Sequence, residues 1–267
     1  MNQIKSLANE IFSRFGNVKR ARGYFLYTEK GVRLTDMFLE GGKAILGWGH
    51  EGTGAFTIFK NALERGACGS FQTCFENQLH RAVCELLGLR TNFFFNDKNK
   101  ALAAAKEISS AEPFFYFPWR EENSKLDESD CVIFQPTLPW CEDFFVLAVK
   151  STLNIEENIK KSLSENEVII PPPLQAALAR SIYDLIKQLQ VREEKNWFAY
   201  DTVLTKYWTR NGPWLFPKVP KEKYEDFVSH CLECALVVSP VYEIPSIVPA
   251  GVDKGNFTKL KNSPFVF

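Results

Sequence analysis

The stretch GWGHEGTG, residues 47–54, combines four glycines with a histidine and a carboxylate. Glycine-rich turns can cradle phosphates, because the backbone N–H groups approach the anion closely. The spacing excludes a dinucleotide-binding loop, since no GxGxxG follows a strand here, and the Gly-Lys-Ser/Thr end of a P-loop is missing. Two interpretations remain: His50 and Glu51 line a cleft, or the stretch is a domain crossover with a hydrogen-bonded histidine.

A lysine and a short basic loop are further candidates for chemistry. Lys150 ends the apolar run DFFVLAVK, and a desolvated lysine with a lowered pKa can form an imine. A lysine at a strand end can equally extend to solvent. Asn96, Lys98 and Lys100 precede or begin an alanine-rich helical pattern, where helix N-terminal N–H groups favour an anion. A solvated helix start is the alternative interpretation of this loop.

An arginine and a pair of cysteines complete the set. Arg210, in the run WTRNGPW, could grip a carboxylate bidentately, or the run is a turn held by aromatic packing. Cys231 and Cys234 form a CxxC beside His230 within a helical pattern. No second ligand pair stands at zinc-site spacing, so we predict no metal site and leave the role of the two cysteines open.

The composition limits the class of protein. A chain of 267 residues with 45% hydrophobic content can bury a sizeable core. Lys and Arg total 32, as do Asp and Glu, so no global field favours nucleic acid or an anionic membrane, although a local basic patch remains possible. The N-terminus has an amphipathic helical pattern, and no apolar run approaches about 18 residues. We therefore expect a cytoplasmic protein with neither partner.

The hydrophobic periodicity predicts an α/β chain. Near the N-terminus it predicts a helix, a hairpin that turns at residues 29–31, and an extended piece over 43–46. Other helices are expected at 53–65, 75–88, 96–108, 174–190, 195–207 and 221–234. Other strands are expected at 91–95, 113–119, 130–136, 143–151, 213–216 and 235–239. Residues 151–170 are expected to be a connector.

The order of these parts resembles the class-III aminotransferases, pyridoxal-phosphate enzymes of fold type I. The stretches GYFL (23–26), GVRLTD (31–36) and Gly49-His50 are similar to that family's Gly-Val-Tyr strand, its Gly-x-Arg-Tyr-Leu-Asp strand and its Gly-His step into a helix. The stretch CLECALVVSP (231–240) is similar to the family's closing Gly-Val-Leu-Val-Ser-Pro strand. The resemblance is therefore carried by the two ends of the chain.

The resemblance implies a domain organisation and a cofactor site. The implied fold is α/β: a reduced aminotransferase-like large domain with a buried mixed sheet, residues 51–209, plus an α+β small domain built from residues 1–50 and 210–267. The loop with Asn96, Lys98 and Lys100 stands where the family presents Gly and Thr to the phosphate of pyridoxal phosphate. Lys150 stands where the family has its Schiff-base lysine.

Three hypotheses follow. No Asp-Glu-Val-like strand is present to pair with the pyridine nitrogen. We therefore predict a shortened, degenerate relative that has lost standard transamination and acts as a homodimeric binding or interaction protein. The alternative is a minimal pyridoxal-phosphate aminotransferase that uses Lys150, with His50 and Arg210 contacting an amino acid or keto acid. The third is an unrelated α/β fold whose chain ends pack apart. A second polypeptide could also supply the missing segment, which an exposed apolar patch would indicate.

Overall fold

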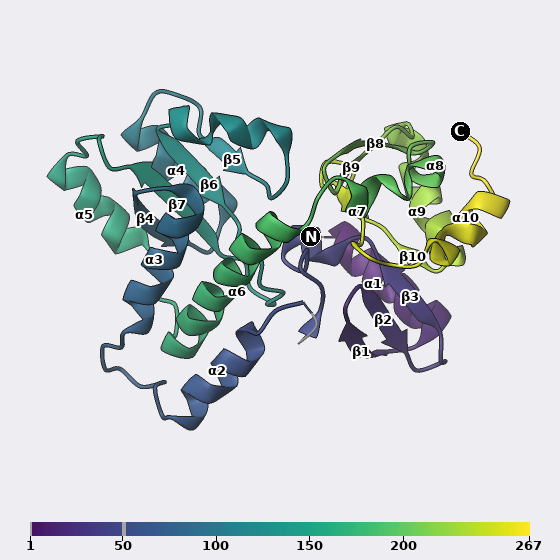
Figure 1. Cartoon of the computed structure of the whole chain (residues 1–267), viewed down its shortest axis with the longest axis horizontal. Coiled ribbons are helices and arrows are strands. Elements are labelled where there is room, and N and C mark those ends of the chain that lie inside the picture. The colour runs from purple at the N-terminus through teal and green to yellow at the C-terminus, as the bar shows by residue number, and fades with distance from the viewer. Residues whose placement is uncertain (1, 50–51) are drawn as a thin grey trace. The chain divides into compact units, whose positions relative to one another are not determined.

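The structure, a computed structural model, describes residues 2–49 and 52–267, which form two compact units (Figure 1). Unit 1 consists of Met1–Gly52 and Gln190–Phe267, and unit 2 is Thr53–Leu189. The second boundary lies twenty residues before the one expected at 209/210. The physical reason is that the segment after residue 190 bonds within unit 1: Arg210 pairs with Asp201, and the Tyr200 hydroxyl donates to the carbonyl of Val252.

The first sheet of unit 1 joins the two ends of the chain. Its strands lie in the order β1 (Val18–Arg22), β2 (Phe25–Thr28), β3 (Arg33–Asp36) and β10 (Leu236–Val237). The antiparallel pairing of β2 with β3 confirms the predicted hairpin. β10 pairs in parallel with β3, with Leu236 opposite Thr35. The chain ends therefore pack together, which is contrary to the hypothesis of an unrelated fold with its ends apart.

An aromatic core stabilises the rest of unit 1. Trp208, at 0% exposure, packs against the rings of Tyr207 and Phe227, with centroid distances of 5.8 and 5.0 Å. The hairpin of β8 and β9 is antiparallel, and β11 extends it. The remaining elements of unit 1 are α1 (Asn2–Phe15), η1 (Leu39–Gly42), α7 (Lys195–Phe198), α8 (Asp201–Leu204), β8 (Trp208–Asn211), β9 (Trp214–Pro217), η4 (Lys221–Lys223), α9 (Tyr224–Glu233), β11 (Ser246–Ile247), η5 (Lys254–Phe257) and α10 (Thr258–Asn262).

The extended piece predicted over residues 43–46 is wrong, because the chain folds back on itself there. The consecutive residues from Leu39 to Gly42 have positive φ angles of 47, 50, 68 and 116°. Local hydrogen bonds replace strand pairing: the amide of Ala44 donates to the carbonyl of Leu39, and that of Gly47 to the carbonyl of Ala44. Apolar side chains at 44–46 are buried by this turn, and burial alone does not distinguish it from a strand.

Unit 2 is built on a mixed sheet, as the sequence predicts. Its order is β4 (Arg90–Phe95), β7 (Phe145–Lys150), β6 (Cys131–Phe134) and β5 (Phe114–Tyr116). β7 is antiparallel to β4 and β6, and β5 is parallel to β6. All of β6 and the centre of β7 are buried, which explains their unbroken apolar sequences.

Helices cover the sheet of unit 2. Its helical elements are α2 (Ala55–Glu64), α3 (Phe75–Leu87), α4 (Lys98–Ile108), η3 (Glu121–Glu128), α5 (Glu157–Asn166) and α6 (Pro172–Val191). α5 lies in the segment that we expected to be a connector. It forms because its buried Leu163, together with Ile155 and Ile159, packs into the same core as Phe93 and Leu147 of the sheet.

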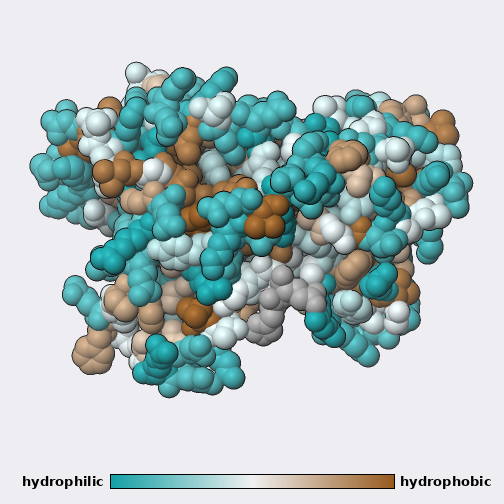
Figure 2. Space-filling model, viewed as in Figure 1, coloured by the Kyte–Doolittle hydropathy of each residue, from teal (hydrophilic) through white to brown (hydrophobic). Residues whose placement is uncertain are grey.

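None of the helices in residues 2–49 and 52–267 is long and apolar enough to cross a membrane. On the side drawn in Figure 2, hydrophobic residues form patches that hydrophilic residues interrupt.

A pair of glycines tests the folded turn. We expect Gly42→Ala to lower the free energy of unfolding by about 3 kcal/mol, because φ is +116° and a Cβ would lie 2.8 Å from the buried ring of Trp214. Gly31→Ala is the matched control: its φ is +77°, but an added Cβ meets no described atom within 4 Å, so we expect a loss of about 1 kcal/mol. Urea denaturation measures both losses, and equal values would contradict the packing argument.

Candidate functional site

The loop after β4 contains a carboxylate that caps the helix that follows. Asp97 is the N-cap of α4, and its Oδ1 accepts hydrogen bonds from the amides of Asn99 at 2.8 Å and Lys100 at 3.1 Å. These are the N–H groups that a phosphate at the start of this helix would use. The capping carboxylate stabilises the helix and places a negative charge where the phosphate would lie.

The basic side chains of the loop point to solvent and to a ring. Asn96, Lys98 and Lys100 are all exposed. The Nζ atom of Lys98 lies 4.6 Å from the centre of the Phe115 ring in β5, a cation–π contact. The structure therefore places Asn96 just before α4 and both lysines in the exposed first turn of that helix, and their cofactor-binding role stays a prediction.

Lys150 lies at the other end of the sheet. In the antiparallel ladder of β4 and β7, Lys150 is opposite Arg90, and Phe145 is opposite Phe95. Five residues of strand, about 17 Å, therefore separate Lys150 from the start of the 96–100 loop. One pyridoxal phosphate molecule does not span that distance. The Nζ atom of Lys150 donates to the carbonyl of Asp127 at 3.0 Å, and its Schiff-base role stays a prediction.

Arg210 belongs to unit 1, and its guanidinium is already engaged. It donates to the two carboxylate oxygens of Asp201 at 2.7 and 2.9 Å and to the carbonyl of Gly212 at 2.8 Å. It also pairs with Glu194. The hydrogen bonds that Arg210 donates to Asp201 raise the pKa of this guanidinium above its ordinary value. The guanidinium group that was predicted to bind a substrate carboxylate binds the carboxylate of Asp201 instead.

The glycine-rich stretch crosses from one unit to the other. The unit boundary lies between Gly52 and Thr53. Before it, Trp48 and Gly23 exchange backbone hydrogen bonds of 3.1 and 2.6 Å. After it, the Thr53 hydroxyl donates to Asp184 at 2.8 Å. The ends of the stretch are thus anchored in different units, whereas His50 and Glu51, and with them the predicted substrate contact of His50, lie outside the described residues.

A buried carboxylate organises the approach to that stretch. Asp36, at 2% exposure, accepts hydrogen bonds from the amides of Phe38 at 2.9 Å and Leu39 at 3.0 Å, and from the indole of Trp48 at 2.8 Å. Desolvation raises its pKa to about 6. Sequence reasoning noted Asp36 only as part of a motif. Its position at the end of an apolar strand, immediately before a turn, is the signal that it caps that turn.

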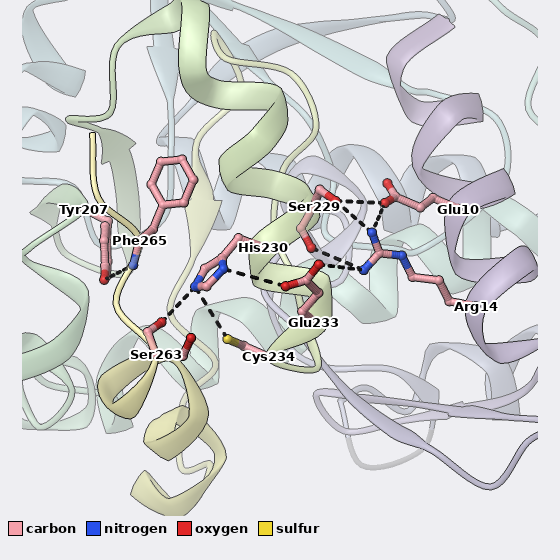
Figure 3. A network of polar contacts seen from close by, with 9 residues as sticks. All are labelled: Glu10, Arg14, Tyr207, Ser229, His230, Glu233, Cys234, Ser263 and Phe265. Carbon is pink, nitrogen blue, oxygen red and sulfur yellow. Dashed lines mark hydrogen bonds and ion pairs between the residues drawn. The ribbon is translucent and has the colours of Figure 1, made fainter.

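Cys234, the second cysteine of the pair, lies in a polar cluster that joins α9 to the C-terminal segment (Figure 3). The Nε2 atom of His230 contacts the carbonyl of Ser263 at 2.8 Å and lies 3.9 Å from the sulfur of Cys234. Burial raises the pKa of Cys234, and that of Cys231 well above its usual value. The raised pKa values lower the fraction of thiolate, which is the form that reacts with oxidants and binds metals.

The same cluster reaches α1. Arg14 donates to the Ser229 hydroxyl at 2.7 Å and pairs with Glu10. Within residues 2–49 and 52–267, no group of three or more His, Cys, Asp or Glu side chains could hold a metal ion. The arrangement in Figure 3 holds α1, α9 and the C-terminal segment together.

Comparison with solved structures defines the class of fold. The ornithine aminotransferase of Plasmodium yoelii superposes with a TM-score of 0.65 at 12% identity, covering 97% of each chain. An acetylornithine aminotransferase from Elizabethkingia anophelis gives 0.62 at 12% identity, covering 95% of this chain and 96% of that one. An omega-transaminase from Sphaerobacter thermophilus gives 0.65 at 10% identity, covering 97% and 98%. The chain therefore has an aminotransferase-like fold, which confirms the predicted fold class.

Sequence comparison identifies relatives but no named family. No family model matches the chain. An uncharacterized protein of Treponema pallidum is 27% identical over 290 residues, which cover 90% of this chain and 91% of the relative. One of Borreliella burgdorferi is 24% identical over 253 residues, which cover 91% and 89%.

The pH dependence of stability tests the buried Asp36. Its folded-state pKa, about 6, lies above the ordinary 3.8. Between these values the folded chain keeps a proton that the unfolded chain releases, so this stabilisation is full below pH 4 and is lost as the pH rises through 6. We expect the stability of the wild type relative to Asp36→Asn to fall by about 3 kcal/mol from pH 4 to pH 7. Urea denaturation of both proteins measures it, and a constant difference would contradict the prediction.

Proposed function

We propose that this protein is an aminotransferase-like binding or interaction protein that does not carry out standard transamination. The observation that supports this most directly is the ladder between β4 and β7. It places Lys150 and the 96–100 loop at opposite ends of the sheet. An imine at Lys150 would leave the cofactor phosphate far from the 96–100 loop, which is the predicted phosphate site.

Two further contacts support the proposal. Asp97 occupies the N–H groups at the start of α4, and Asp201 occupies the guanidinium of Arg210. In each case a carboxylate of the same chain occupies the donors that were expected to bind an anionic ligand. A phosphate or carboxylate ligand would have to displace the carboxylate already bound there and would be repelled by its negative charge, so the contacts oppose anion binding.

We also propose that the chain forms a homodimer in the cytoplasm. Two-fold assemblies are the commonest homo-oligomers, and fold-type I enzymes build their sites across a two-fold interface. Buried thiols such as Cys131, Cys231 and Cys234 fit a reducing compartment. An amino acid or keto acid ligand is retained as a proposal only together with the alternative enzyme, which would use Lys150, Arg210 and His50.

Reaction with pyridoxal phosphate distinguishes the two proposals. We expect wild-type protein and Lys150→Ala to give the same absorption spectrum with the cofactor, and the same yield of adduct after borohydride reduction. Lys106→Ala, at an exposed lysine of α4, is the matched control for adventitious reaction. Peptide mass mapping locates any adduct. A shifted imine band that is trapped by reduction and lost only in Lys150→Ala would establish the enzyme alternative instead.

The oligomeric state tests the homodimer separately. The mass of the chain is 30.5 kDa, and gel filtration with light scattering should give twice this value. The dimer should persist when pyridoxal phosphate is absent, since the proposed binding or interaction role does not require the cofactor. A single species with the monomer mass at all protein concentrations would remove the dimer from the proposal.

A further inference from the structure

One face of the β1–β3 sheet gathers arginines around two aromatic rings. In the antiparallel register, Arg20 of β1 and Arg33 of β3 both lie opposite Tyr27 of β2, and Arg22 lies opposite Phe25. Residues directly opposite each other in a sheet project from the same face. All five side chains therefore share one face.

The guanidinium groups lie over the rings. The guanidinium carbon of Arg20 is 5.4 Å from the centre of the Tyr27 ring, and that of Arg33 is 4.4 Å from the centre of the Phe25 ring. The arginines are exposed and the rings half-buried. The alternate residues Leu26 and Leu34 are buried on the opposite face. The face thus presents planar cationic and aromatic groups to solvent.

The charge of this segment departs from that of the whole chain. Residues 16–34 contain five of the 32 cationic side chains and one of the 32 carboxylates. That carboxylate, Glu29, accepts hydrogen bonds from the backbone and side-chain amides of Asn17. The balance of the whole chain predicted no nucleic-acid partner. The positions of the charges in the fold lead to a different expectation for this face.

Protection of a sheet edge explains only part of the pattern. Charged residues on an edge strand such as β1 discourage pairing with other sheets, and Lys19, Arg20 and Arg22 serve that purpose. Edge protection does not account for Arg33, which lies on the inner strand β3, between β2 and β10. Nor does it account for the two rings on the same face. Arg33 also donates a hydrogen bond to the side-chain oxygen of Asn256 at 3.2 Å. The combination of exposed guanidinium groups and rings matches a ligand with both negative charge and flat apolar groups.

We propose that this face binds single-stranded nucleic acid. Unpaired bases stack on aromatic rings and on arginine guanidinium planes, while the phosphates are attracted by the surrounding cations. A duplex keeps its bases stacked inside, and an acidic peptide has charge without flat bases. The proposal is independent of the proposed loss of transamination, because every residue involved belongs to unit 1, whereas Lys150 and the 96–100 loop belong to unit 2.

The test is fluorescence anisotropy with a fluorescein-labelled oligothymidine 12-mer and full-length protein. We expect a dissociation constant on the order of 10 µM at 50 mM salt and weaker binding at 200 mM salt. Arg20→Gln/Arg33→Gln should weaken binding at least tenfold and reduce the salt slope by about 1.4. The matched control, Arg65→Gln/Arg81→Gln, removes two exposed arginines from unit 2 and should bind like the wild type.

Two further variants separate stacking from charge. Tyr27→Leu should weaken binding about tenfold with an unchanged salt slope, whereas Tyr27→Phe should retain it. Arg20→Lys/Arg33→Lys keeps both charges at exposed positions that do not endanger folding, and it should lose affinity because lysine lacks the guanidinium plane. Circular dichroism verifies that each variant is folded.

Several results would overturn the proposal. They are no binding by the wild type at 50 mM salt, equal affinity for a 12-base-pair duplex, or displacement of the oligonucleotide by an equal concentration of polyglutamate. Full affinity in Arg20→Lys/Arg33→Lys would reduce the face to a simple cationic patch, and equal loss in the unit 2 control would place binding elsewhere.

Discussion

The parallel pairing of β10 with β3 is the interaction on which unit 1 depends. It joins residues about two hundred positions apart, and the amides of Thr35 and Met37 donate to the carbonyls of Ala235 and Val237 on either side of the pair. Closing so long a loop costs chain entropy, which a two-residue strand cannot offset alone. The dense aromatic packing around Trp208 and Phe227 supplies the remaining stabilisation, because it brings β8, α9 and the C-terminal segment together.

Strand direction has the corresponding importance in unit 2. Because β7 is antiparallel to β4, the end of β7 lies beside the beginning of β4. Lys150, at the end of β7, and the loop that follows β4 therefore lie at opposite edges of the sheet. The carboxylates of Asp97 and Asp201 act locally, because each accepts hydrogen bonds from donors that an anionic ligand would need. The donors at the start of α4 and on Arg210 are thus engaged by carboxylates of the same chain.

Much of the fold could be predicted because burial leaves a clear pattern. The hairpin turn at Gly31 and the apolar strands β6 and β7 follow from local sequence. α5 was missed because its few apolar residues, Leu163 among them, are separated by charged ones. β8 was missed because Trp208 to Asn211 shows no alternation and was taken for a turn. Strand register and ion-pair partners are not encoded locally, so the position of Lys150 relative to the 96–100 loop could not be foreseen.

The insertion of unit 2 between the two segments of unit 1 affects synthesis on the ribosome. Unit 2 is continuous in sequence and can complete its sheet as soon as its last strand and helices emerge. β3, in contrast, must wait for β10, and at typical translation rates the interval between residues 36 and 237 is roughly 10 to 40 s. During that interval the hydrogen-bonding edge of β3 is unpaired and open to incorrect pairing. A chaperone bound at the N-terminal hairpin would protect this edge until β10 emerges.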